Sequence, residues 1–138
     1  MSEENKAAFR RVTDAFSSGD LSAFDDLIAP DMVEHNPAPG QAPGPEGMKQ
    51  MAGMFRTAFP DARITVEDLI AEGDKVAGRM SFTGANTGEF MGAQATNKSV
   101  TIQEIHICRF SGGKMVEHWG LEDSLGMMQQ LGLIPEMG

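Results

Sequence analysis

Polar side chains alternate with apolar ones in two stretches near the C-terminal end of the chain. Glu104 and His106 lie two positions apart in the first, and His118, Gly120 and Glu122 follow the same spacing in the second. Because successive side chains of a strand point to opposite faces, each set shares one face of its strand. Imidazoles and carboxylates are common proton carriers in enzymes. The pattern predicts an acid/base site on two neighbouring strands, with His106, His118 and Glu122 as catalytic candidates.

A tight turn at Gly112 and Gly113 would join these two strands into a hairpin. Simple pairing across that turn places the two polar sets side by side. The opposite face would then carry Ile105, Ile107 and Trp119. A sheet face with such side chains is rarely left in water. We therefore expect assembly through this face into a homodimer or homotetramer.

Each polar candidate also has a structural interpretation. Asp123 follows Glu122 and could supply the catalytic acid/base, but it is also placed to cap the final helix. His106 could be a hydrogen-bonded core histidine. Glu104 must pair with a histidine or face water, because an unpaired buried carboxylate is costly. Cys108 has no obvious activating base and is expected to be a small buried apolar residue.

A second group of candidates precedes a proline-rich loop. His35 and Asn36 stand just before four prolines between positions 37 and 45, which predict a stiff loop. We expect both side chains at the pocket, and methionines to give its apolar wall flexibility. The residues expected to bind substrate are His35, Asn36, Met51, Phe55, Phe82, Asn86, Phe90, Met91 and Glu104.

A metal site is not expected. His35, His106, His118 and Glu104 could in principle supply two histidines and one carboxylate. These ligands would come from three separate elements, and no HxH or HExxH spacing is present.

The elements that would position these residues begin with helices. Apolar residues at helical spacing predict helices over residues 4–17 and 21–28. Asp20 is placed to cap the second helix and Pro30 to end it. A small strand could follow at residues 32–36.

The spacing of apolar residues changes from 3.6 to 2 at about position 62. The later elements are expected as a helix over residues 45–59, strands over 64–70, 76–82, 98–110 and 115–121, and a helix over 124–132 that carries Leu125, Met128 and Leu131 on one side. Helices followed by hairpin-linked strands predict an α+β fold. Three N-terminal helices would cover the concave face of a curved antiparallel sheet, and this cone-shaped barrel would enclose a small apolar molecule.

Length and charge limit the classes of partner. The 138 residues suit a single domain over residues 1–138. The net charge of -9 disfavours nucleic acid and anionic membranes as partners. The single cysteine excludes an intrachain disulfide. Because neither a secretory signal nor an apolar run of ~20 residues is visible, we expect a cytoplasmic protein without a membrane partner.

Three long stretches together carry a resemblance to a known family. They read VEHNPAPGQAPGPEGM, then MFRTAFPDARITVEDLIAEGDKVAGRMSFTGANTGEFMG, then IHICRFSGGKMVEHWGLEDSLGMMQQLGL. In order and spacing they resemble the SnoaL-like polyketide cyclases of the nuclear-transport-factor-2-like superfamily. The most specific pieces are FPD, the GD turn, and the GGKMVEHW hairpin followed by QQLG. The resemblance covers nearly the whole chain and implies the cone-shaped fold.

The resemblance implies an activity. It is the intramolecular aldol closure of a polyketide ester, performed without metal or cofactor by an acid/base in an apolar pocket. The family's catalytic histidine aligns with His106, and its catalytic aspartate aligns with position 120, which is Gly120 here. Glu122 or Asp123 would then act as acid/base, or the reaction has been lost. Asn86 stands where relatives often have a histidine.

Two other functions stay open beside a cofactor-free lyase or isomerase acting on an apolar carbonyl compound. An epoxide hydrolase of the limonene-epoxide-hydrolase kind would need an Asp-Arg-Asp cluster. Arg79 and Arg109 lie on expected strands, but suitably paired aspartates are not evident. A protein that kept the pocket and lost the acid/base would bind a small molecule without turning it over.

Overall fold

The computed structural model describes residues 2–90 and 92–135, so the expected wall residue Met91 lies outside the described residues. Helices come first and hairpin-linked strands follow, as the sequence predicts. The helical elements are α1 (Ser2–Ser18), a 3-10 turn (Leu21–Ala23), α2 (Phe24–Leu27), α3 (Gly44–Ala58) and α4 (Ser124–Gln130). The strands are β1 (Ile28–Glu34), β2 (Arg63–Glu72), β3 (Lys75–Ala85), β4 (Ser99–Ser111) and β5 (Lys114–Glu122).

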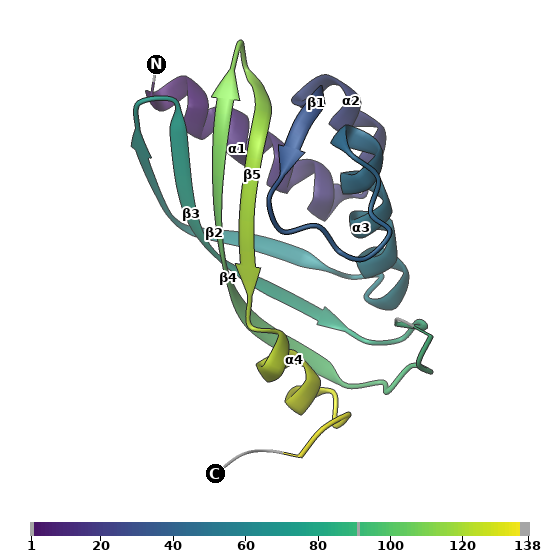
Figure 1. The fold of residues 1–138 in the computed structure, drawn as a ribbon. Helices are drawn as coiled ribbons and strands as arrows, with labels where there is room; N and C mark the ends of the chain where they lie inside the picture. The colour runs from purple at the N-terminus through teal and green to yellow at the C-terminus, as the bar shows by residue number, and fades with distance from the viewer. Residues whose placement is uncertain (1, 91, 136–138) are drawn as a thin grey trace.

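The five strands form one sheet in the order β1-β5-β4-β3-β2. Three of its pairings are antiparallel, whereas β1 runs parallel to β5. The sheet curves without closing, so β1 and β2 remain its edges (Figure 1). The α+β fold and the curved sheet expected from the sequence are confirmed. The parallel edge strand is an addition to the purely antiparallel sheet that was expected.

The core lies between the helices and the concave face of the sheet. Phe9 and Phe16 of α1 are buried against it, and Phe16 packs on Phe82 of β3 with ring centroids 6.3 Å apart. Gly78 of β3 lets α1 approach closely, because an added Cβ would collide with the Phe9 ring. Apolar burial of this kind is the main favourable term in folding, and it fixes α1 and α3 over the sheet.

The segment after α1 differs from the prediction. The expected helix over residues 21–28 is a 3-10 turn followed by the single turn of α2, and Ile28 already begins β1. Pro30 lies inside β1 rather than ending a helix, and the pairing with β5 is irregular between Ile28 and Val33. Proline is tolerated there because β1 is an edge strand. Asp20 accepts a hydrogen bond from Ser22 Oγ (2.8 Å) and makes no side-chain cap.

The C-terminal helix packs Met128 and Leu131 on the core as predicted, and only Leu125 departs from the prediction. Met127 and Leu131 are buried, whereas Leu125 is 52% exposed. Within the described residues, no helix has both the length and the apolar character needed to cross a membrane.

The convex face of the sheet carries a cross-strand row of apolar side chains. Ile70 pairs through Ala77 with Ile107, and Ile107 pairs with Trp119. In the adjacent row Ile105 is 55% exposed. Exposed apolar side chains in contiguous rows are typical of protein interfaces.

The homodimer or homotetramer expected through this face stays a prediction. Light scattering at micromolar concentration should give a mass of two or four chains. Ile105→Lys should reduce that mass to one chain, because a buried lysine loses its hydration. Glu72→Lys, at the tip of the β2–β3 hairpin, is the control for added positive charge and should leave the mass unchanged. A wild-type mass of one chain would contradict the prediction.

Candidate active site

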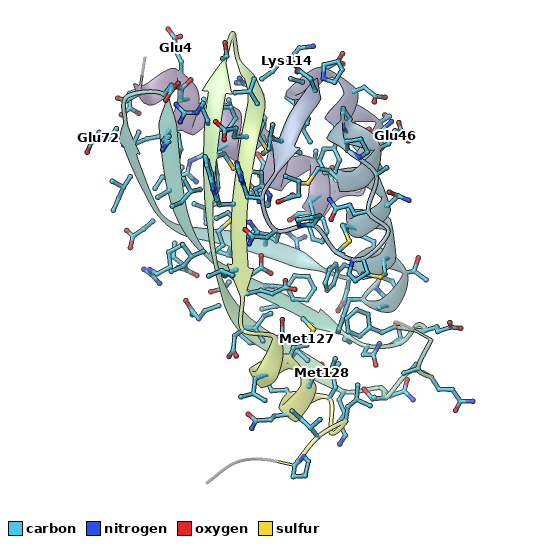
Figure 2. The ribbon with its side chains drawn as sticks, viewed as in Figure 1. Glu4, Glu46, Glu72, Lys114, Met127 and Met128 are labelled. Atoms are coloured by element: carbon cyan, nitrogen blue, oxygen red, sulfur yellow. The ribbon has the colours of Figure 1, made fainter. Side chains whose placement is uncertain are left out.

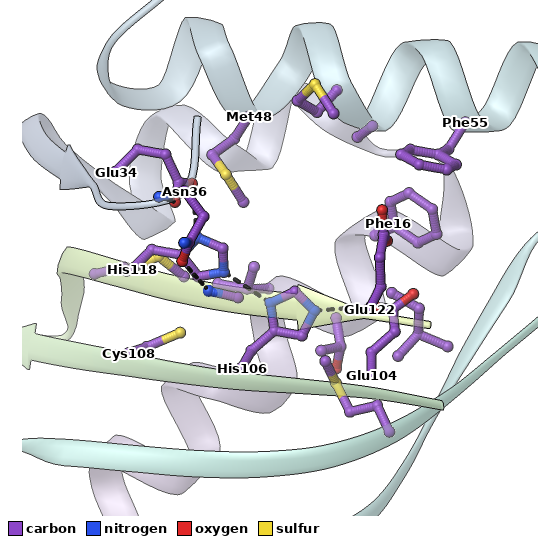
Figure 3. A pocket seen from close by; sticks show the side chains of 18 of the residues that line it. Phe16, Glu34, Asn36, Met48, Phe55, Glu104, His106, Cys108, His118 and Glu122 are labelled. Atoms are coloured by element: carbon purple, nitrogen blue, oxygen red, sulfur yellow. Dashed lines mark hydrogen bonds and ion pairs between the residues drawn. The ribbon is translucent and has the colours of Figure 1, made fainter. Parts of the chain in front are cut away.

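A pocket of about 220 Å³ lies between the helices and the concave face of the sheet. Most of its wall is apolar and is contributed by α1, α3 and β3. The apolar side chains include Phe9, Val12, Phe16, Met48, Met51, Phe55, Met80 and Phe82, and the polar ones include Glu34, Asn36, Glu104, His106, His118 and Glu122. The polar side chains come from β4, β5, β1 and the loop that follows β1 (Figure 3). One end of an otherwise apolar pocket is therefore strongly polar.

Four of the polar side chains form a continuous hydrogen-bonded series. Glu104 Oε1 lies 2.8 Å from His106 Nε2, and His106 Nδ1 lies 2.8 Å from His118 Nε2. His118 Nδ1 then lies 2.6 Å from Glu34 Oε1. We call this series the Glu–His–His–Glu row. Its members are largely shielded from water, with the Glu104 and Glu34 side chains each 8% exposed.

Strand register creates the row. Opposite His106 on β5 stands Gly120, and His118 stands opposite Cys108. The two imidazoles are thus diagonal neighbours, and they meet only because Gly120 has no side chain. A Cβ at Gly120 would lie 2.5 Å from His106 Nδ1 and 3.0 Å from His118 Cε1. On the other side of β5, the parallel pairing aligns Glu34 with His118.

The pKa values of Glu34 and Glu122 are shifted in opposite directions. Burial alone would raise the pKa of Glu34, but its hydrogen bond with His118 and the charge of that histidine hold the pKa below its ordinary value. Burial raises the pKa of Glu122, and the negative charge of Glu104 raises it further, while His106 partly offsets both. Glu122 and Glu104 stand directly opposite each other on β5 and β4. Two close carboxylates with different surroundings are a common arrangement in acid/base sites.

Comparison with known proteins bears on this site. The family model described as SnoaL-like polyketide cyclase matches residues 6–131. The chain belongs to the SnoaL-like polyketide cyclase family. Aklanonic acid methyl ester cyclase DnrD of Streptomyces peucetius is 29% identical over an alignment of 129 residues, and the match covers 89% of this chain and 87% of that protein.

Two further relatives agree with this family. Nogalonic acid methyl ester cyclase of Streptomyces nogalater is 29% identical over 122 residues, covering 86% of this chain and 90% of its own length. The solved structure of TsrD from Streptomyces laurentii superposes with a TM-score of 0.88 at 28% identity and covers 97% of this chain and 98% of its own. The TsrD structure therefore shares the fold over nearly the whole of this chain.

Most residues proposed from the sequence line the pocket. His106, His118, Glu104 and Glu122 face it from the last two strands, as the alternation predicts. The side-chain oxygen of Asn36 accepts a hydrogen bond from the Gly120 backbone N–H at 2.9 Å. The apolar residues Met51, Phe55 and Phe82 also line the pocket.

His35 was wrongly placed at the pocket. Its ring lies on the outer face, where Nε2 is 2.8 Å from Glu117 Oε2 and the ring stacks on Trp119 with centroids 4.4 Å apart. The residue that sequence reasoning missed is Glu34. It lies two positions before Asn36 and therefore shares its face, whereas adjacent residues of a strand cannot both face one pocket. His35 lies on the outer face, whereas His106 and His118 line the pocket. The three histidines considered as metal ligands therefore do not lie together.

Asn86 and Phe90 are structural residues and do not line the pocket. Asn86 Nδ2 donates to the backbone oxygens of Ala58 (3.1 Å) and Gly88 (2.8 Å), and its Oδ1 accepts from Thr96. Its polar atoms are thus used in holding the loop after β3. Phe90 is buried behind Phe55, with ring centroids 5.5 Å apart.

Asp123 also lies outside the pocket. Its Oδ1 accepts a hydrogen bond from the Gly126 backbone N–H at 2.8 Å, which makes it the N-cap of α4. Cys108 lines the pocket, and burial together with the nearby negative charge of Glu34 raises the pKa of its thiol. A neutral, buried thiol agrees with the expected apolar role.

The close contact over Gly120 gives a stability prediction. Gly120→Ala should lower the free energy of unfolding by about 1–3 kcal/mol, the usual cost of overpacking, because the new methyl group would push the His106 ring away. Gly53→Ala in α3 is the matched control, since no atom lies within 4 Å of its added Cβ. It should stabilise by roughly 0.5–1 kcal/mol. Urea denaturation measures both, and an unchanged midpoint for Gly120→Ala would contradict the contact.

Glu122→Gln should stabilise the protein at neutral pH. The raised pKa of Glu122 means that folding favours its protonated form, so stability falls as pH rises from the ordinary glutamate pKa to the raised value. Glutamine removes this loss, and the gain should disappear at acid pH. Glu72→Gln is the control for one lost charge, because Glu72 projects away from the sheet at a hairpin tip (Figure 2). Thermal unfolding across pH tests the difference; a pH-independent effect would contradict it.

Proposed function

We propose that this protein catalyses a cofactor-free intramolecular aldol cyclisation of a polyketide ester, with Glu122 as the acid/base. The observation that carries this proposal is the setting of Glu122. Its carboxyl group lines the pocket at its open end, where the residue is still exposed to water. Partial burial of the carboxyl and the charge of Glu104 raise its pKa, and no hydrogen bond ties it to another side chain within the described residues. A raised carboxyl pKa brings proton exchange closer to neutral pH.

The chemistry needs one carboxylate that both takes and returns a proton. Ionised Glu122 removes a proton from a carbon that lies between two carbonyl groups, and the electron pair is delocalised as an enolate. The enolate carbon then attacks a ketone carbon of the same molecule, which forms the new carbon–carbon bond and an alkoxide. Glu122, now protonated, returns its proton to that alkoxide. No atom is lost, and the residue ends ionised as it began.

The other two carboxylates are less suited to this work. Glu104 accepts a hydrogen bond from His106, and Glu34 accepts from His118 and from the backbone of Asn36. Hydrogen bonds to a carboxylate favour its ionised form. Protonation of either group would break the Glu–His–His–Glu row, whereas protonation of Glu122 leaves it intact.

The charge of the pocket favours an ester over a free acid. Three carboxyl groups line it, and no lysine or arginine does so within the described residues. The carboxylates outnumber any charge that His106 and His118 can supply, so a substrate carboxylate would be repelled, whereas a methyl ester is neutral. The names of the two curated relatives specify methyl esters as substrates.

The size of the pocket favours a compact or partly enclosed substrate. Its volume of about 220 Å³ falls below the roughly 300–1,000 Å³ of typical small-molecule sites. Met48, Met51 and Met80 line it, and their flexible thioether side chains can adjust to an apolar ring.

The two arginines considered for an epoxide hydrolase lie outside the pocket. Arg79 pairs with Asp68 at 2.8 Å, and Arg109 pairs with Asp74 and Glu117 at 2.7 Å each. All of these side chains lie outside the described pocket lining, which holds neither arginine nor aspartate. An Asp-Arg-Asp cluster therefore has no support in the pocket, and we do not propose this reaction.

Turnover of a polyketide methyl ester, such as those in the relatives' names, tests the proposal. Glu122→Gln should lower kcat by roughly 100-fold or more, the usual contribution of an acid/base. Asp123→Asn is the matched control, because asparagine also caps helices well, and its turnover should stay near wild type. Binding of the ester without turnover by the native protein would favour the non-catalytic function. Equal turnover by Glu122→Gln and the native protein would remove Glu122 from the mechanism.

A further inference from the structure

The Glu–His–His–Glu row ends in a carboxylate on each side. Glu104 faces His106 Nε2 at 2.8 Å, and Glu34 faces His118 Nδ1 at 2.6 Å. The two inner nitrogens, His106 Nδ1 and His118 Nε2, face each other at 2.8 Å. All four ring nitrogens are therefore engaged within the row.

This geometry sets the number of protons. An ionised carboxylate only accepts hydrogen bonds, so the ring nitrogen that faces each carboxylate must carry a hydrogen. The contact between the two inner nitrogens needs one more hydrogen. The two rings therefore hold three protons on four nitrogens and one positive charge. Loss of the shared proton would leave two lone pairs facing each other, and a fourth proton would oppose two N–H groups.

Glu34 is held as an anion at the far end of the row. Besides the bond with His118, its Oε2 accepts the Asn36 backbone N–H at 3.1 Å. Burial opposes its ionisation, but these hydrogen bonds and the charge of His118 outweigh burial and lower the pKa of Glu34. The positive charge on the two rings thus lies between two anions.

Few other titratable groups face the row. Glu122 reaches the pocket from β5 and Cys108 from β4, and burial followed by the charge of Glu34 raises the pKa of the Cys108 thiol, which keeps it neutral. The pocket-lining side chains of α1, α2, α3, β2 and β3 are apolar except for Thr13, and the loop after β1 adds only the amides of Asn36 and Gln41. The charge balance of the pocket is thus set by the row and Glu122.

We propose that His118 and Glu34 are positioning residues: with His106 they hold one shared proton whose charge keeps Glu104 ionised, so that Glu122 is the carboxylate that exchanges protons with the substrate. Glu104 stands opposite Glu122, and an ionised Glu104 makes a second anion beside it unfavourable. The role assigned to Glu34 rests on the proposed function of Glu122, whereas the count of three protons does not.

Nuclear magnetic resonance of the ligand-free protein tests the proton count directly. The chain has three histidines, and the third, His35, lies on the outer face, so labelling histidine with nitrogen-15 gives a simple spectrum. Near neutral pH, His106 and His118 together should show three protonated nitrogens, with the inner two sharing one proton. Two independent neutral rings, or two fully protonated rings, would overturn the proposal. This measurement uses the native protein alone, so it decides the count even where a variant fails to fold.

Glu34→Gln tests whether the negative charge of Glu34 helps to hold the shared proton. Glutamine keeps the hydrogen bond to His118 Nδ1 but removes the negative charge, so the change from three protons to two should move to lower pH. Glu117→Gln is the matched control, because Glu117 pairs with His35 on the outer face. It should leave the proton count of His106 and His118 unchanged. An unchanged titration of His106 and His118 in Glu34→Gln would overturn the role of Glu34.

The pH profile of turnover separates positioning from simple charge removal. Removing the distant negative charge of Glu34 alone would move the acidic limb of kcat/KM to lower pH. Loss of the shared proton removes a positive charge that lies close to both Glu104 and Glu122. The two opposed carboxyl groups should then take up their first proton at higher pH, and the limb should move to higher pH. A shift to lower pH, or none, would overturn the positioning role. If the three protons are found but Glu122→Gln keeps full turnover, the proposed function fails while the proton count stands.

Discussion

The imidazole rings of His106 and His118 meet above a residue without a side chain, and the polar end of the pocket depends on that contact. Cross-strand register places the two histidines diagonally, at a separation that side chains bridge only when nothing stands between them. Gly120 leaves that space open, and the rings approach to a centroid distance of 5.0 Å. A larger residue at position 120 would displace one ring. The carboxylate that pairs with that ring would then lose its hydrogen bond.

Three strands must be in register for the row to form. β4 supplies Glu104 and His106, β5 supplies His118, and the parallel edge strand β1 supplies Glu34. Burying such groups is costly unless each finds a partner, and within the described residues no buried side-chain nitrogen or oxygen lacks a hydrogen bond. The helices contribute apolar walls that keep water away, which strengthens the interactions of the row. Exclusion of water therefore makes the row costly to bury and also strengthens its hydrogen bonds.

The sequence predicts the face of a side chain better than its partner. Strand alternation is local, so spacing places Glu104 with His106 and His118 with Glu122, and the short turn between the two strands brings both pairs to one surface. Glu34 was missed because only the pairing of β1 with β5, more than 80 positions away (His118 to Glu34), brings it to the pocket. Asn86 was misassigned for a similar reason, since its partners Ala58 and Thr96 are distant in sequence.

The loss of the aspartate expected at position 120 need not remove acid/base chemistry from the fold. Strand geometry returns to the same face after two residues, so Glu122 presents its carboxyl to the pocket about 7 Å further along β5. The space vacated at Gly120 is taken by the His106 ring, which brings positive charge beside Glu104. Gly120 and Glu122 depend on each other. With a side chain at position 120 the two rings could not meet. Glu104 would then lack the positive charge that keeps it ionised, and the proton could reside on Glu104 instead of Glu122.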